Sequence, residues 1–154
     1  MNKKAIKYAL LVVFAGLLLI VSNKINNGFL EDSDFKVNQE MLDFYETTHS
    51  EDIILASQDD LNMDGKKDAV IIYSESKKSN KMTVVVTDGK SYYLTEPVPA
   101  PMENQTIKFK NIDEKDELET IVSGEKNGNV GFAIFRIEDK KAVDIFGEGM
   151  ESCC

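Results

Sequence analysis

The strongest hydrophobic pattern in the chain is an uninterrupted apolar run close to its start. Residues 8–21 are all apolar or small, and Lys3, Lys4 and Lys7 precede them. Lysines on this side of an apolar run stay in the cytoplasm, so the chain after the run is exported. If the helix continues to Ile25, it reaches the roughly 20 residues that a membrane span needs.

The residues after this run favour an anchor over a cleaved signal peptide. No small-x-small cleavage site follows the run, so residues 1–25 are predicted to be an uncleaved signal-anchor and single transmembrane helix. Residues 26–34 are predicted to be a polar tether. The domain after them is then extracytoplasmic, at the cell membrane. A cleaved signal and a buried core helix are the alternatives.

Residues 35–49 show the apolar spacing of an amphipathic helix. Its apolar stripe consists of Val37, Met41, Leu42, Phe44 and Tyr45. Ser33 or Asp34 is positioned to cap the start of this helix. His49, the one histidine in the sequence, is interpreted as a solvated side chain, because a metal-binding histidine normally has further ligands nearby.

From Ile53 the pattern changes to short runs rich in β-branched and aromatic residues, separated by polar turns. The predicted strands are residues 53–56, 69–73, 82–87, 91–94, 106–110, 120–123, 131–137 and 142–146. Prolines at 97, 99 and 101 divide them into two sets with the same order of elements, which indicates a weak repeat of about 50 residues. We predict a mainly β fold: a small antiparallel sheet or sandwich of two repeated strand-loop-strand units, with one helix.

Charge and residue usage exclude several functions. The 154-residue chain has a formal net charge of −9, which argues against nucleic acid as a partner and makes cations the natural ligands. Both cysteines lie at the end of the sequence, so disulfides do not hold the domain together. The sequence contains no Ser/His/Asp set, Cys–His pair or phosphate loop, and independent catalysis is therefore not predicted.

The loop between the first two predicted strands has the ligand spacing of a calcium site. Oxygen-bearing groups recur at alternate positions around Gly65, and the predicted ligands are Asp60, Asn62, Asp64, the backbone of Lys66, and Asp68. Ile71 stands where an EF-hand needs glutamate. The loop resembles instead the calcium loops of FG-GAP and related β-propeller repeats, which implies a structural calcium. The alternative is a turn whose carboxylates accept backbone N–H groups.

Residues 147–154 are predicted to form a flexible tail, hinged at Gly147 and Gly149. The adjacent thiols of Cys153 and Cys154 are suited either to binding a soft metal ion or to closing a strained vicinal disulfide. Met150 offers a third sulfur, and simple packing is the alternative role for this side chain.

An exported acidic domain that ends in Cys153-Cys154 resembles the Cys-Cys-COOH (seleno)protein family, the Sao C type. This resemblance implies a system that also encodes transport proteins, a thioredoxin-like protein and an organomercurial-lyase-like enzyme. A transporter or the thioredoxin-like protein is then the expected partner. This sequence has cysteine at both terminal positions.

Together, these features predict a membrane-anchored extracytoplasmic thiol protein, with residues 35–146 as its domain. It would bind or relay a soft, mercury-like metal or organometal through Cys153 and Cys154. One alternative is a thiol-disulfide redox partner of a thioredoxin-like protein. Another is a calcium-stabilised extracellular interaction module.

Overall fold

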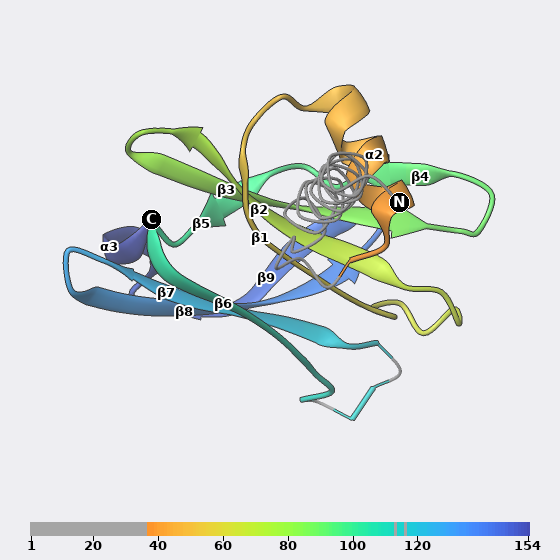
Figure 1. The fold of residues 1–154 in the computed structure, drawn as a ribbon. Coiled ribbons are helices and arrows are strands. Elements are labelled where there is room, and N and C mark those ends of the chain that lie inside the picture. The colour runs from red at the N-terminus through yellow and green to blue at the C-terminus, as the bar shows by residue number, and fades with distance from the viewer. Residues whose placement is uncertain (1–36, 113, 116) are drawn as a thin grey trace, which may run out of the picture. The chain divides into compact units, whose positions relative to one another are not determined.

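Two antiparallel sheets make up most of the described chain, which comprises residues 37–112, 114–115 and 117–154 of a computed structural model (Figure 1). The predicted anchor and tether lie outside these residues. Among the described residues, no helix is long and apolar enough to cross a membrane. The predicted mainly β fold is confirmed for this part of the chain.

The first sheet has five strands and the second has four. The first contains β1 (Ile53–Asp59), β2 (Asp68–Ser76), β3 (Ser79–Thr87), β4 (Tyr92–Leu94) and β5 (Val98–Ala100). The second contains β6 (Glu103–Lys110), β7 (Glu119–Lys126), β8 (Asn129–Glu138) and β9 (Lys141–Glu148). Both sheets follow chain order, β1-β2-β3-β4 and β6-β7-β8-β9, and β5 pairs with β3.

The turn residues explain the hairpins of the second sheet. Asn127 and Gly128, between β7 and β8, both have positive φ angles, as do Asp139 and Lys140 between β8 and β9. Two consecutive residues with positive φ match the right-handed twist of the flanking strands.

The main hydrophobic core lies between the two sheets. Val70, Ile72 and Val84 of the first sheet pack in one cluster with Val122 and Phe135 of the second. The opposite face of the first sheet packs against the helix α2 (Gln39–Thr48), which Figure 1 shows across that sheet. Because β2 is covered on both faces, its residues 69–73 are all buried and apolar or aromatic rather than alternating with polar residues.

The boundaries of α2 differ from the prediction of a helix over 35–49. The helix begins at Gln39, because the side chain of Asn38 caps it by accepting the N–H of Glu40 at 3.0 Å. The alternative caps, Ser33 and Asp34, lie outside the described residues. His49 follows the helix and stacks on the ring of Tyr45, with 4.8 Å between ring centroids.

The two sheets also share a buried carboxylate at equivalent positions. Asp68 begins β2 and accepts the N–H of Leu61 at 3.2 Å, seven residues earlier. Glu119 begins β7 and accepts the N–H of Ile112 at 2.7 Å, also seven residues earlier. Glu119 additionally pairs with the buried guanidinium of Arg136. This correspondence supports the interpretation of two related units.

Candidate functional site

The end of the chain is folded onto the second sheet. β9 continues through Gly147, which pairs with Ala133, to Glu148, which pairs with Phe132. The residues that follow form the short helix α3 (Met150–Cys153). The sequence predicted a flexible tail from residue 147, and the structure places this segment in strand pairing and a helical turn.

Two glycines allow α3 to approach the sheet closely. A Cβ atom on Gly131 would lie 2.7 Å from the Sγ of Cys153 and 2.7 Å from the carbonyl of Gly149. A Cβ atom on Gly149 would lie 2.6 Å from the carbonyl oxygen of Val130, and Gly149 has a φ of 69°. Gly149 thus serves close packing and a left-handed turn rather than the predicted hinge.

Two hydrogen bonds attach the last two residues to the domain. The backbone N–H of Met102 donates to the carbonyl of Cys153 at 3.0 Å. The Nζ of Lys126 donates to the main-chain oxygen of Cys154 at 2.8 Å. The connection from β5 to β6 is itself braced, because Asn80 donates to the carbonyl of Pro101 at 2.8 Å. Both cysteines therefore lie against an ordered support.

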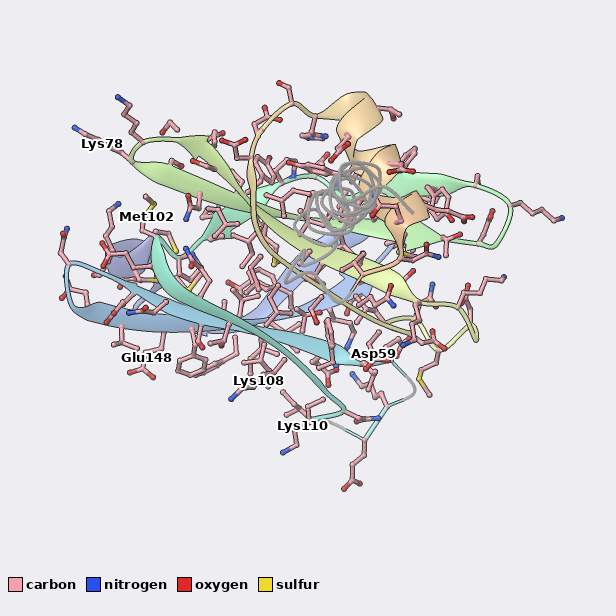
Figure 2. All side chains as sticks on the ribbon, in the orientation of Figure 1. Asp59, Lys78, Met102, Lys108, Lys110 and Glu148 are labelled. Carbon is pink, nitrogen blue, oxygen red and sulfur yellow. The ribbon has the colours of Figure 1, made fainter. Side chains whose placement is uncertain are left out.

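The sulfur atoms of Met150, Cys153 and Cys154 form a compact triangle, which we call the sulfur cluster. The two Sγ atoms are 3.3 Å apart, and the Sδ of Met150 lies 3.7 Å from Cys153 and 4.0 Å from Cys154. Spacings of three and four residues bring side chains to one side of a helical turn. Figure 2 shows sulfur atoms beside α3, near the labelled Met102.

The two thiols have different surroundings. Cys153 is fully buried and Cys154 is half-buried. Burial raises the pKa of the Cys154 thiol to about 12, assisted by its hydrogen bond with Cys153, while the charge of Lys126 acts in the opposite direction. The thiol of Cys154 is therefore protonated at neutral pH, which makes it a weak nucleophile. A metal ion must displace that proton to bind.

A cavity of about 360 Å³ borders the sulfur cluster. It is lined by Ser79, Asn80, Lys81, Pro99, Met150, Glu151 and Cys154. Cys154 and Met150 thus face a space that a ligand can occupy, whereas Cys153 is not part of the lining.

In the predicted calcium loop, the side chains accept hydrogen bonds from the backbone of the loop itself. Asp60 accepts the N–H of Asp64 at 3.0 Å through one oxygen and the N–H of Gly65 at 2.8 Å through the other. Asn62 also accepts the N–H of Asp64, and Asp64 accepts the N–H of Lys66 at 2.9 Å. These are the bonds expected of the metal-free turn.

The last predicted calcium ligand, Asp68, is engaged in the same way. One carboxylate oxygen accepts the N–H of Leu61 and the other accepts the N–H of Thr87, at 3.2 and 3.1 Å. In the described part of the chain, no three or more His, Cys, Asp or Glu side chains are grouped to hold a metal ion. Calcium binding stays a prediction.

Replacing Asp64 by alanine tests that prediction. If the loop binds calcium, the substitution lowers the melting temperature in calcium-containing buffer. In chelator it changes the melting temperature little, because only the exposed hydrogen bond from Lys66 is lost. Differential scanning calorimetry of both proteins in both buffers measures the effect. Identical melting of the unsubstituted protein with calcium and with excess chelator would show that the loop is only a turn.

The buried carboxylate of Asp68 predicts a pH dependence of stability in chelator. Burial raises the pKa of Asp68 from 3.8 to about 6, although its two backbone hydrogen bonds act in the opposite direction. Because the native state binds this proton more tightly than the unfolded state, stability increases as the pH falls through 6 towards 4. Relative to Asp68→Asn, the unsubstituted protein should gain unfolding free energy over this range. A constant difference between the two proteins in urea titrations would contradict this expectation.

Comparison of the chain with protein-family models, curated protein sequences and solved structures finds no match. The sulfur cluster and its support are therefore the features that indicate a function. Sequence patterns singled out the three sulfur residues. Gly131, Met102 and Lys126 were missed, because nothing in their local sequence indicates that they contact the end of the chain.

Proposed function

We propose that this protein binds or relays a soft metal ion or organometal through Cys153 and Cys154. The observation that carries the proposal is the sulfur cluster, in which three soft donor atoms lie within 4.0 Å of one another. Thiolate and thioether groups prefer soft ions. The apolar run of residues 8–21 supports placing this domain outside the cell membrane on a single anchor.

The surroundings of the pair suit reversible binding better than catalysis. The raised pKa of Cys154 keeps its thiol protonated until a cation arrives, so binding releases a proton and weakens as the pH falls. The cavity beside Cys154 gives an incoming thiol room to exchange for one of the metal's ligands. A transporter or a thioredoxin-like protein of the same system is the proposed partner for this exchange.

One observation favours redox exchange as a second candidate function. The two Sγ atoms are already 3.3 Å apart, and a disulfide bond needs about 2.05 Å. Oxidation would form the S–S bond with loss of two protons and two electrons to a partner disulfide, which a thioredoxin-like protein would supply. A calcium-stabilised interaction module has no comparable support in the geometry of the described residues.

Anaerobic titration of the reduced full chain with Hg(II), in competition with a small dithiol, tests the proposed function. We expect one ion per chain, held more tightly than by the competing dithiol, because the sulfur atoms are already gathered and little ordering is required. A protein in which both cysteines are replaced by serine is the control. Equal binding by this control and the unsubstituted protein would overturn the proposal.

A further inference from the structure

We propose that Met150 completes a three-sulfur site for a monovalent soft cation, Cu(I), together with Cys153 and Cys154. This inference rests on the proposed function and specifies its ligand. Met150 is the first residue of α3, and its thioether lies within 4.0 Å of both thiols. Met150 also packs against the main hydrophobic core, so its side chain is held beside the two thiols.

The spacing of the sulfur atoms fits trigonal coordination. An ion about 2.3 Å from each of three sulfur atoms places those atoms about 4.0 Å apart, whereas linear coordination by two thiolates needs about 4.6 Å between them. The observed separations are 3.3, 3.7 and 4.0 Å. The smallest expansion of the cluster therefore leads to a three-coordinate ion.

The support around Cys153 limits any larger expansion. Its carbonyl accepts the N–H of Met102, its side chain is fully buried, and its Sγ lies directly above Gly131. Any expansion of the cluster therefore falls mainly on the half-buried side chain of Cys154. Linear binding of Hg(II) by the two thiolates therefore requires a larger movement of the Cys154 side chain than three-coordinate binding of Cu(I) does.

The chemical types of the three sulfur ligands also favour Cu(I). Thioether and thiolate sulfur together favour Cu(I), whereas zinc takes four ligands drawn from Cys, His, Asp and Glu. No group of three or more such side chains is present among the described residues. Binding forms two copper–thiolate bonds and one copper–thioether bond, and the two thiols release their protons. Copper stays Cu(I), so no electron acceptor is required.

The cavity defines how the ion reaches the cluster. Met150 and Cys154 line it, and Cys153 lies behind them. The ion therefore meets Met150 and Cys154 first, and Cys153 completes the site. Asn80 and Lys81 are also part of its lining.

The test compares Met150→Leu with Met41→Leu in the reduced, anaerobic full chain. Leucine has a similar volume to methionine but no sulfur, so both variants are expected to fold. Met41 is the matched control, because it is a buried methionine of α2 that packs on the opposite face of the first sheet. Cu(I) affinity is measured by competition with a chromogenic Cu(I) chelator, and Hg(II) affinity by competition with a small dithiol.

We expect Met150→Leu to weaken Cu(I) binding by about tenfold or more, which corresponds to roughly 1.4 kcal/mol, and to change Hg(II) binding less. Met41→Leu should bind Cu(I) as the unsubstituted protein does. X-ray absorption at the copper edge should report three sulfur neighbours, and two in Met150→Leu. Unchanged Cu(I) affinity in Met150→Leu, or a two-sulfur shell in the unsubstituted protein, would overturn this inference. If neither Hg(II) nor Cu(I) binds, the proposed function itself fails.

Discussion

Exchange of Cys154 for serine is expected to weaken Hg(II) binding by orders of magnitude while leaving the free energy of unfolding nearly unchanged. Two thiols on one chain make the second metal–sulfur bond intramolecular, and its loss removes a large effective concentration. Cys154 is half-buried and borders the cavity, so a serine hydroxyl at this position can be solvated.

Exchange of Cys153 for serine should reduce binding to a similar extent and also lower stability. Cys153 is fully buried, and burying a hydroxyl without a partner costs about 1–3 kcal/mol. Urea unfolding and competitive titration of both variants separate the two effects. Equal stability of the two serine variants would contradict the docked position of Cys153, and affinities equal to that of the unsubstituted protein would contradict the metal site.

Gly131→Ala is expected to displace the helix that carries the cysteines. The new methyl group would lie 2.7 Å from the Sγ of Cys153 and from the backbone of Gly149, and overpacking of this kind costs about 1–3 kcal/mol. Because the sulfur cluster would have to open, the affinity for Cu(I) should fall by about tenfold. Alkylation of Cys153, followed by mass spectrometry, should become faster as the buried thiol is exposed.

Gly147→Ala is the matched control for this substitution. Its added methyl group would meet the Oδ2 of Asp144 at 3.3 Å and the Cβ of Ala133 at 3.6 Å, which are milder contacts. We expect alkylation of Cys153 in this variant to stay slow. If Gly131→Ala and Gly147→Ala behave alike in both assays, then close packing at Gly131 does not hold the cluster.

Strands could be predicted from the sequence where a long apolar or β-branched run was present. β2 and β8 contain long apolar or β-branched runs, and both were predicted as strands, though each extends beyond the predicted residues. β5 was missed because it contains Pro99, which normally interrupts a sheet. Here β5 pairs only with β3, and an edge strand tolerates a residue without an N–H.

The start of α2 and the contacts of residues 147–149 could not be predicted from the neighbouring residues alone. The apolar spacing predicted α2, but its start was placed too early because the cap at Asn38 was not distinguished from Ser33 and Asp34. The glycines at 147 and 149 suggested a hinge from composition alone. Their actual roles depend on β8, which approaches them only in the folded protein.

For the same reason, the candidate site could be predicted only in part from the sequence. The adjacent cysteines and the nearby methionine could be identified from the sequence, because their chemistry does not depend on the fold. The burial of Cys153, the cavity beside Cys154 and the support from Lys126 arise from contacts between distant segments. These contacts hold the three sulfur atoms in one cluster in the structure, whereas the sequence alone suggested a flexible chelating tail.

Native mass spectrometry can show whether Cys153 and Cys154 together bind a metal ion. The reduced full chain is mixed, under exclusion of air, with one equivalent of Hg(II) and an excess of a small monothiol. We expect a one-to-one complex whose mass shows the loss of two protons, because both cysteines bind as thiolates, and no complex when both are replaced by serine. A metal-free protein, or one lighter by two hydrogen atoms through a disulfide between Cys153 and Cys154, would contradict the proposed metal site.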